Sequence, residues 1–384
     1  MSEEIVQLTA ADFEDAMDFL NLVFGTHGPH DFETLLPAIY QPTDECMACN
    51  HAVRVGGRIR AIVGMFPLAC QVGGTTLRVA GIGGVSTHPR TRGAGYMKAL
   101  MSLCVDKMRQ QGYHLSYLGG QRQRYQYFGY DRCGTLHSYA LNSANIRHCF
   151  GSVDAGIRFE PMDGQDGARL ERARALHDAQ TIHCVRAVGN FHHHLRNWHN
   201  RAHAALDVSG DMVGYVVAAA RGDRVWEVVA TSEDTAERML RAWVAAGAAG
   251  STAVDLPSTR ADLGRSLGRW CEHTGVGAAG NFQVFDWPQV LRALLEARAL
   301  AGPLAPGRVV VDISGQRLEM CVEGSSRACA ETTAAPHVQW DGYTALRALF
   351  GPLPASAVAP LPGAAAVLDQ WCPLPLSWPH QDGV

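Results

Sequence analysis

Hydrophobic positions between Arg78 and Gly134 change period partway along the stretch. An apolar run at 79–87 stops just before Pro89, which cannot continue a central ladder, so the run predicts a buried strand. From 97 to 108, apolar residues recur at three- and four-residue steps and predict one face of a helix that ends at Gly112. Residues 114–119 predict a second, short strand. The order is therefore strand, glycine-containing turn, helix, strand.

The segments before this stretch predict the antiparallel part of one domain. The expected elements are an edge strand at 5–8, a helix at 13–23, a short helix at 32–36, paired strands at 51–55 and 59–70, and a closing strand at 135–141. Thr9 is suited to cap the first helix, and Pro37 is suited to end the second. Gly73 and Gly74 then turn the chain into the strand at 79–87.

Strand, turn and helix recur in the second half of the chain. The expected elements there are helices at 168–179, 233–246, 287–300 and 342–349, a hairpin of 212–220 with 225–230, and strands at 309–314 and 317–322. Ser232 is suited to cap the helix at 233–246, and Pro288 suits the first turn of the helix that follows. The C-terminal tail carries Trp371 and Trp378, so we expect it to be packed rather than disordered.

Length, charge and cysteine usage narrow the class of protein. A chain of 384 residues suits two or three domains, and a net charge of −4 argues against a nucleic-acid partner. The 11 cysteines are odd in number and scattered, and the first residues are acidic where a secretion signal would be basic. We therefore expect a cytoplasmic protein with free thiols. No apolar run is long enough to span a bilayer, so we expect no membrane partner.

The turn between the strand at 79–87 and its helix is suited to bind an anion. The first turn of a helix leaves backbone N–H groups without partners and carries partial positive charge. Gly93 and Gly95 allow close approach to that backbone, and Arg90 and Arg92 add charge beside it. The spacing fits neither the G-x-G-x-x-G motif nor the P-loop motif. A pyrophosphate is the natural guest of such a turn.

The motif Arg-x-x-Gly-x-Gly at 90–95, after a Val-Ser-Thr-x-Pro strand end, resembles the acetyl-CoA loop of the GNAT superfamily of N-acetyltransferases. The resemblance implies acetyl-CoA as co-substrate and no metal. It assigns cofactor binding to Val85, Ser86, Thr87, Arg90, Arg92, Gly93, Ala94, Gly95 and Tyr96. Backbone N–H groups around Val85 would hold the thioester carbonyl.

A Tyr-x-x-Phe-Gly-Tyr element at 125–130 resembles the Eis-like acetyltransferases, which are named for enhanced intracellular survival. The spacing alone does not choose among Tyr125, Tyr127 and Tyr130, but the resemblance implies that Tyr125 is the general acid. It also implies that the C-terminal carboxylate, here that of Val384, is the general base, with Asp382 as the competing candidate. The family ends in a bulkier aromatic residue, so this chain departs from it at the last position.

The same resemblance implies a mixed α/β (α+β) architecture of three domains. Residues 1–150 would be the catalytic GNAT domain, 151–284 a second GNAT-like domain without a cofactor loop, and 285–384 a sterol-carrier-like domain whose C-terminus returns to the active site. At the start of the helix at 233–246 the second domain has acids, which would repel a pyrophosphate. The family suggests a homo-oligomer, either a trimer or a hexamer.

Three further groups of residues are candidates for binding. Phe24, Phe32 and Tyr40 would line the acceptor pocket of an acetyltransferase, although ordinary packing explains them equally well. Cys46 and Cys49 have the spacing of half a zinc site, but no second pair matches them. Adjacent histidines at 192–194 on a helix point in three directions and cannot all bind one ion. We therefore expect no metal.

Together these features favour an acetyl-CoA-dependent N-acetyltransferase that acts on a primary amine. The family suggests an acceptor such as an aminoglycoside, a polyamine or a lysine side chain. The alternative is a non-catalytic acyl-CoA-binding or regulatory protein, for which a proton donor at position 125 would serve no purpose.

Overall fold

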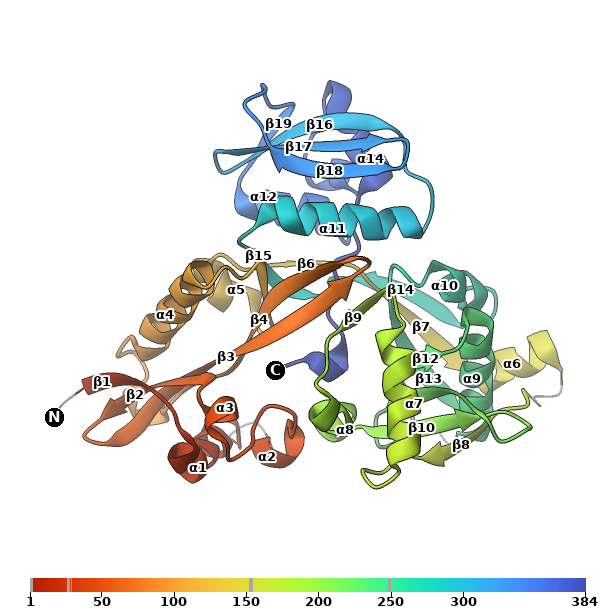
Figure 1. Ribbon diagram of the computed structural model, residues 1–384, viewed down its shortest axis with the longest axis horizontal. Coiled ribbons are helices and arrows are strands. Elements are labelled where there is room, and N and C mark those ends of the chain that lie inside the picture. The colour runs from red at the N-terminus through yellow and green to blue at the C-terminus, as the bar shows by residue number, and fades with distance from the viewer. Residues whose placement is uncertain (1–2, 26–27, 29, 152–154, 248–249) are drawn as a thin grey trace.

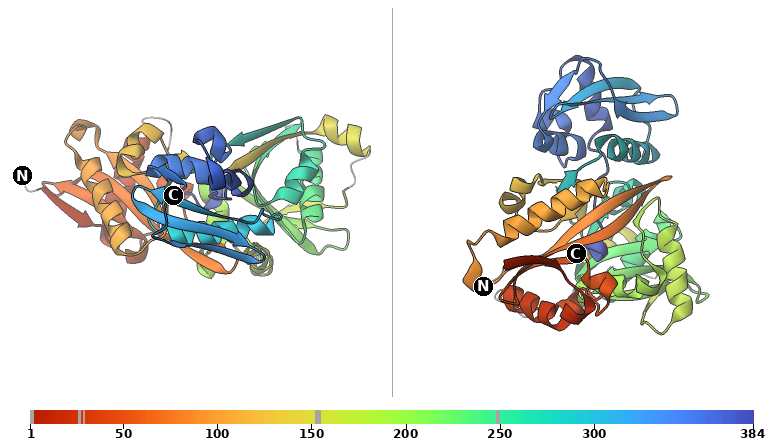
Figure 2. Two further views of the ribbon diagram at one scale, coloured as in Figure 1. Left: turned by 90° about the horizontal axis from the view of Figure 1, so that it is seen from above. Right: turned by 60° about the vertical axis from the view of Figure 1, so that its left-hand side comes forward.

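The computed structural model describes residues 3–25, 28, 30–151, 155–247 and 250–384. The strands in this part of the chain form three sheets, and each sheet carries its own helices (Figure 1). Seen from above, the C-terminal unit in blue lies over the middle of the molecule, between the orange N-terminal unit and the green second unit (Figure 2). The architecture is mixed α/β.

The first sheet is antiparallel except for one parallel pair. Its strands, in order across the sheet, are β1 (Glu3–Gln7), β2 (Asn50–Val55), β3 (Arg58–Val72), β4 (Thr75–Thr87), β5 (Leu115–Leu118), β15 (Gly280–Val284) and β6 (Asp131–Cys133). The short strand β9 (Ile182–Cys184) pairs with the end of β3. The edge strand and the hairpin expected from the sequence are confirmed by β1 and by the antiparallel pairing of β2 with β3.

Side chains alternate across the first sheet and meet two helical layers. Phe66 on β3 packs with the helices α1 (Phe13–Phe24) and α2 (Phe32–Leu35). Its neighbour Met65 packs with α4 (Tyr96–Gln110) on the opposite face. Because successive side chains of a strand point to opposite faces, apolar residues at both positions bury the sheet on both sides.

The second sheet is also mixed and has one parallel pair. Its strands, in order across the sheet, are β14 (His273–Gly277), β7 (Leu136–Asn142), β13 (Ser251–Pro257), β12 (Arg224–Ala230), β11 (Met212–Ala218), β10 (Arg201–Leu206) and β8 (Arg158–Pro161). Its helices are α6 (Ser143–Phe150), α7 (Gly167–Asp178), α8 (Phe191–Arg196), α9 (Glu233–Ala246) and α10 (Ala261–Leu267). In the sequence, α9 lies between the parallel strands β12 and β13, as α4 lies between the parallel strands β4 and β5.

The two sheets exchange strands, which corrects one expectation from the sequence. Residues 135–141 were expected to close the first domain, but β7 pairs with β13 and β14 in the second sheet. Conversely, β15 lies in the first sheet between β5 and β6. Strand pairing depends on which backbone edges meet in space, and the local hydrophobic pattern carries no information about that partner.

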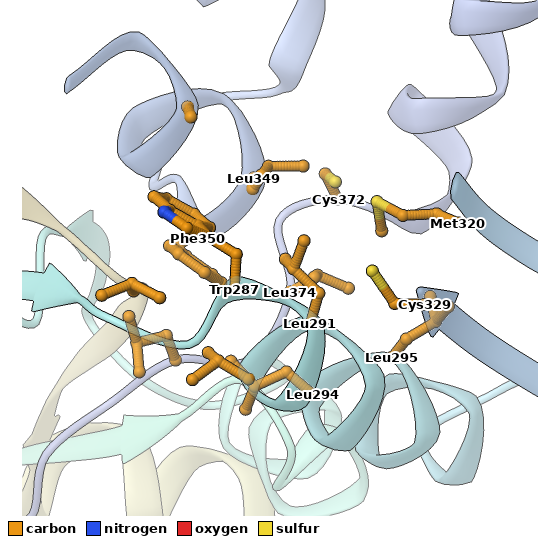
Figure 3. Close-up of a cluster of buried hydrophobic side chains, with 14 of the residues drawn as sticks. Trp287, Leu291, Leu294, Leu295, Met320, Cys329, Leu349, Phe350, Cys372 and Leu374 are labelled. Carbon is orange, nitrogen blue, oxygen red and sulfur yellow. The ribbon is translucent and has the colours of Figure 1, made fainter. Parts of the chain in front are cut away.

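The C-terminal unit has a third, smaller sheet with helices packed against it. Its strands, in order across the sheet, are β18 (Ser326–Glu331), β17 (Gln316–Glu323), β16 (Gly307–Ile313) and β19 (Val338–Trp340). Its helices are α11 (Trp287–Leu300), α12 (Gly342–Phe350), α13 (Ala355–Val358) and α14 (Leu368–Trp371). Figure 3 shows the apolar core between them, in which Trp287 and Phe350 stack with ring centroids 6.1 Å apart.

After α14 the chain leaves the C-terminal unit and runs back between the other two. Leu376 accepts a hydrogen bond from the backbone of Thr135, Trp378 stacks on Tyr117, and both tryptophans of the tail are buried as expected. The C-terminus lies below the middle of the molecule, close to α8 (Figure 1). No helix in the described part of the chain has the length and apolar character needed to cross a bilayer.

Candidate active site

The parallel pairing of β4 with β5, at the centre of the first sheet, covers only part of β4. They pair in parallel from Val79 to Ile82, and β4 then continues to Thr87 without β5. The register of β4 against β3 also shifts there, so Gly84 and Val85 have no partner in the ladder. Gly84 has φ +59°, which is the left-handed region that favours glycine. This bulge leaves backbone polar groups of β4 beside the gap that the strands open.

The glycine turn connects this gap to the N-terminus of α4. Gly95 caps the helix at φ +85° and Gly93 has φ +89°, so both positions require the left-handed conformation that glycine adopts without strain. The loop is exposed, and the first turn of α4 contains no acid. The guanidinium groups of Arg90 and Arg92 form no ion pair within the described residues. The hydroxyl of Tyr96 donates to the carboxylate of Glu3 at 3.3 Å, so one acid lies near the start of α4, while Arg90 and Arg92 supply positive charge beside the turn.

The three tyrosines of the 125–130 element differ in their surroundings. The hydroxyl of Tyr130 lies 2.7 Å from that of Ser116, and its ring is fully buried. The ring of Tyr127 is 67% exposed and lies under the ammonium group of Lys98. Tyr125, at the end of α5 (Arg122–Tyr125), is buried but makes no hydrogen bond through its hydroxyl to any described residue. Burial raises the pKa of Tyr125 and keeps the phenol protonated at neutral pH.

The ring of Tyr125 packs against Gly120, whose backbone is held by Asn281 from a distant part of the chain. Gly120 has φ +133°, and a Cβ there would lie 2.8 Å from that ring. The side-chain amide of Asn281, on β15, donates to the carbonyl oxygens of Leu118 at 3.3 Å and Gly120 at 3.1 Å. The strand that entered the sheet from the second half of the chain thus holds the end of β5 against the tyrosine.

Aromatic rings connect α1 and α2 to the bulge in β4. The centroids of Phe24 and Phe32 are 4.9 Å apart, those of Phe32 and Tyr40 are 5.4 Å apart, and those of Tyr40 and Phe66 are 5.8 Å apart. A Cβ at Gly84 would lie 2.6 Å from the hydroxyl oxygen of Tyr40. That hydroxyl is buried, and no described residue forms a hydrogen bond with it. The three aromatic candidates thus lie in one row that ends at the bulge.

A cleft of about 550 Å³ opens beside this row, between the first and second units. From the first unit it is lined by Glu45, Phe66 and Leu68, and from the second by Val185 and Asn190. Between its pairing with β2 and with β9, the edge of β3 faces this cleft.

The last residue, Val384, packs against β4. A Cβ added at Gly83 would be 2.6 Å from the carboxyl carbon of Val384, and one at Gly81 would be 2.7 Å from its Cγ2. Only glycine at these two positions leaves room for the tail. The carboxylate of Val384 forms no hydrogen bond or ion pair with the described residues.

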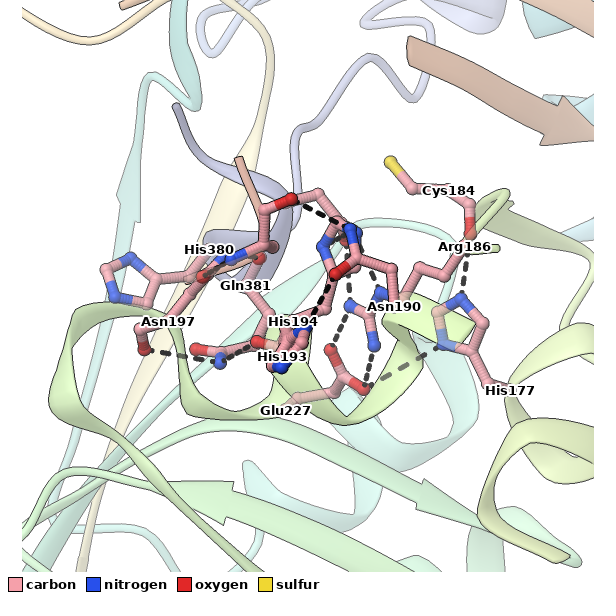
Figure 4. A network of polar contacts seen from close by, with 12 residues as sticks. His177, Cys184, Arg186, Asn190, His193, His194, Asn197, Glu227, His380 and Gln381 are labelled. Atoms are coloured by element: carbon pink, nitrogen blue, oxygen red, sulfur yellow. Dashed lines mark hydrogen bonds and ion pairs between the residues drawn. The ribbon is translucent and has the colours of Figure 1, made fainter. Parts of the chain in front are cut away.

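Asp382, the competing base, is held by an arginine. Arg186 donates to both of its carboxylate oxygens at 2.8 Å and also to both oxygens of Glu227, at 3.1 and 2.7 Å (Figure 4). The Nδ1 of His194 lies 3.3 Å from the same aspartate. Burial alone would raise the pKa of Asp382, but the Arg186 guanidinium holds it well below its usual range. A carboxylate with so low a pKa is a poor proton acceptor.

Amide side chains fix the neighbouring residue of the tail. Asn200 donates to the side-chain oxygen of Gln381, and Asn197 donates to its backbone oxygen, each at 2.8 Å. The side-chain amide of Gln381 donates in turn to the carbonyl oxygen of His194 at 2.8 Å. Sequence reasoning missed this set and Arg186, because partners separated by more than 180 residues leave no local signal.

The remaining candidate ligands serve other contacts. His193 faces Asn190 at 2.8 Å and Gln41 at 3.3 Å (Figure 4). Burial raises the pKa of the Cys49 thiol to about 12, which disfavours the thiolate that a metal requires. Among the residues that the structure describes, no three His, Cys, Asp or Glu side chains are grouped closely enough to hold a metal ion.

The start of α9 in the second unit, which corresponds to the start of α4 in the first, carries different charges. Ser232 caps α9, as expected, and Glu233 and Asp234 occupy its first turn. Arg260 forms an ion pair with Glu233 and also donates to the carbonyl oxygen of Val228 on β12. The cleft beside β12, about 350 Å³, thus contains an arginine of the chain itself at the position that corresponds to the gap between β4 and β5.

Comparison with known proteins identifies the first unit. Residues 4–133 match the family described as the acetyltransferase (GNAT) domain. A comparison of the sequence with curated proteins finds no match.

Solved structures resemble the chain over nearly its whole length. A GCN5-related N-acetyltransferase from Kribbella flavida is 21% identical, with a TM-score of 0.67 over 96% of this chain and 97% of its own. A GCN5-related N-acetyltransferase from Anabaena variabilis is 14% identical, with a TM-score of 0.67 over 98% of both chains. Eis1 from Mycobacterium abscessus is 15% identical, with a TM-score of 0.66 over 96% of both. At these identities the likeness shows a shared fold.

The parallel pair of β4 and β5, the glycine turn at the start of α4 and the family match lie in the same segment of the chain. The protein is therefore an acetyltransferase that carries a GNAT domain at residues 4–133.

Proposed function

We propose that this protein transfers the acetyl group of acetyl-CoA directly to a primary amine, as a distant relative of the Eis-like acetyltransferases. One observation supports this most strongly: Tyr125 and Val384 lie on opposite faces of the same strand. Tyr125 belongs to the layer of Ala80 and Ile82, whereas Val384 lies against Gly81 and Gly83. An acid for the leaving thiol and a base for the entering amine are thus available on the two sides of β4.

Acetyl-CoA would bind with its pyrophosphate at the turn 90–95 and its thioester in the gap between β4 and β5. Backbone N–H groups of Gly93, Gly95 and Tyr96, together with Arg90 and Arg92, would hold the phosphates, whereas the N–H of Ala94 donates to the carbonyl oxygen of Thr91 at 3.3 Å. The N–H of Val85, with Ser86 and Thr87 after it, would face the thioester, because the bulge removes Val85 from the ladder.

The reaction needs two proton transfers. The amine nitrogen attacks the thioester carbonyl carbon, and the oxyanion that forms accepts hydrogen bonds from the β4 backbone. The carbon–sulfur bond then breaks, and Tyr125 protonates the departing thiolate. The carboxylate of Val384 accepts the proton that the amine loses. Asp382 is less suited to this role because both of its oxygens already accept hydrogen bonds from Arg186.

The acceptor would enter through the cleft beside the aromatic row. Of the aromatic row, Phe66 lines this cleft, whereas Phe32 and Tyr40 are buried, so Phe24, Phe32 and Tyr40 would support its wall from within the first unit. Glu45 in the cleft lining would attract a cation. An aminoglycoside, a polyamine or a lysine side chain is such a cation. We further propose that the second unit is a GNAT-like domain that lost cofactor binding, that the C-terminal unit is sterol-carrier-like, and that the chain forms a trimer or hexamer.

Replacement of Tyr125 by phenylalanine tests this function. Purified protein is incubated with acetyl-CoA and a panel of amines, and the release of free thiol is measured. Tyr125→Phe should lower kcat at least about a hundredfold, which is the usual size of general-acid catalysis, while acetyl-CoA affinity by calorimetry stays within about twofold. The control Tyr127→Phe should keep the wild-type rate. Acetyl-CoA binding without turnover of any amine by the wild type would favour the acyl-CoA-binding alternative.

A further inference from the structure

The helix α12 of the C-terminal unit directs two polar side chains at the first unit. Its apolar face, with Leu346 and Leu349, is buried in the core of its own unit. Tyr343 and Arg347 are four residues apart and therefore lie on one face of the helix. The hydroxyl of Tyr343 donates to the carbonyl oxygen of Gln126 at 2.7 Å. Gln126 directly follows Tyr125.

Arg347 reaches the same segment through a buried carboxylate. Its Nε donates to the carbonyl oxygen of Tyr343 at 3.2 Å and forms an ion pair at 3.5 Å with Oδ2 of Asp131, which is completely buried on β6. Arg122, the first residue of α5, donates to both oxygens of Asp131, and the backbone N–H of Arg132 donates to Oδ1 at 2.8 Å. A buried carboxylate is stable only when charged or polar donors surround it, so Asp131 requires these partners.

The two contacts secure both sides of Tyr125. Arg122, three residues earlier, is tied to Asp131, and Gln126, one residue later, is tied to Tyr343. The carbonyl of Gln126 also accepts from the N–H of Gly129 at 3.0 Å, which closes the turn after the tyrosine. The hydroxyl of Tyr125 itself has no partner among the described residues, so its position depends on the packing of its ring and on this backbone support.

We propose that Tyr343 and Arg347 are positioning residues for acetyl transfer, through which the C-terminal unit holds the Tyr125 hydroxyl at the gap between β4 and β5. The proposal rests on the proposed role of Tyr125 as the general acid. The C-terminal unit would then serve both proton transfers, because it also leads the chain back to Val384.

A double-mutant cycle tests the proposal. Tyr343→Phe removes one hydroxyl and should lower kcat about tenfold or more, since a small displacement of a catalytic group has a large kinetic cost. KM for acetyl-CoA should change less than about twofold. In the Tyr125→Phe background, the same substitution should have no further effect on kcat. Arg347→Gln should behave in the same way, and Arg347→Lys should restore part of the rate.

Controls separate positioning from general damage to the fold. Tyr139→Phe removes the hydroxyl of a buried tyrosine in the second sheet, and Arg308→Gln removes an exposed arginine of the C-terminal unit; both should leave kcat unchanged. Hydrogen–deuterium exchange should be faster in the peptide 122–131 of Tyr343→Phe and unchanged in the controls. This measurement requires no acceptor.

Two results would overturn the inference while leaving the proposed function intact. One is a wild-type kcat and unchanged exchange in Tyr343→Phe. The other is an effect of Tyr343→Phe that is equally large with and without Tyr125. A wild-type rate in Tyr125→Phe would instead refute the assignment of the acid, which is a different failure.

Discussion

The carboxyl carbon of Val384 lies 2.6 Å from the position that a Cβ at Gly83 would occupy. This contact joins the last residue to the central strand of the GNAT domain, 301 positions apart in the sequence (384 minus 83). The tail can therefore occupy this place only because Gly83 has no side chain.

Alanine at Gly83 should displace the tail. Because the neighbouring atom is backbone rather than a flexible side chain, the Val384 carboxylate must move, and kcat should fall about tenfold or more. Gly74→Ala is the matched control, since its added Cβ would meet nothing within 4 Å. Steady-state kinetics of both variants provides the comparison. Equal rates would show that the position of Val384 has no bearing on turnover.

Adding residues after Val384 should also lower kcat. A chain lengthened by two glycines loses the carboxylate at this place, so kcat should fall about a hundredfold if that group is the base. Val384→Ala keeps the carboxylate and should stay within a few-fold of the wild type. Full activity in the lengthened protein would remove the terminal carboxylate from the mechanism.

Loss of Arg186 should destabilise the protein by about 3–5 kcal/mol, because it leaves Asp382 and Glu227 buried without their cation. Urea unfolding of Arg186→Met measures this free energy. Arg224→Met, which breaks a more exposed pair with Asp255, should cost less. Similar costs for the two variants would contradict the role of Arg186 in holding the tail.

Stability should also depend on pH through Asp382. Its pKa is lower in the folded protein than its ordinary value of 3.8, so the folded state binds fewer protons below that pH. The stabilisation is therefore complete above about pH 5 and is lost as pH falls below 3.8. In Asp382→Asn, the slope of unfolding free energy against pH between 2 and 4 should be smaller, by up to about 1.4 kcal/mol per pH unit. Parallel slopes would contradict the depressed pKa.

The cofactor loop should depend on charge. Arg90→Gln combined with Arg92→Gln should raise KM for acetyl-CoA about tenfold or more at low salt, since each charge-assisted hydrogen bond contributes about 1.5–3 kcal/mol. Higher ionic strength should reduce the difference from the wild type. Arg109→Gln, which removes one positive charge at the other end of α4, is the control for a general effect of charge. An unchanged KM in the double variant would place the pyrophosphate elsewhere.

Tyr40→Phe should separate function from stability. Its hydroxyl is buried and has no hydrogen-bond partner in the part of the chain that the structure describes, so removing it should leave the free energy of unfolding unchanged or raise it by about 1 kcal/mol. If that hydroxyl instead binds the acceptor beside the bulge, KM for the amine should rise several-fold. Thermal unfolding and acceptor kinetics measure the two effects, and a large loss of stability would show that the hydroxyl has a structural partner.

Much of the catalytic unit could be predicted because its signals are local. The turn at 90–95 combines glycine, arginine and a helix start within six residues, and Tyr125 lies in a short aromatic element. The choice of Tyr125 needed a resemblance, whereas the structure distinguishes it from Tyr127 and Tyr130 by burial and hydrogen bonding.

The sequence by itself determined elements whose cause lies within a few residues. The helix α9 begins and ends where its capping serine and its apolar stripe place it, and the glycines at φ near +90° before α4 are required by the local backbone. The tertiary structure alone decided that β7 and β15 change sheets and that Arg186 meets Asp382 across 196 positions. Those contacts depend on which surfaces meet after the chain collapses. The local sequence around these strands and residues does not indicate which partner each will have.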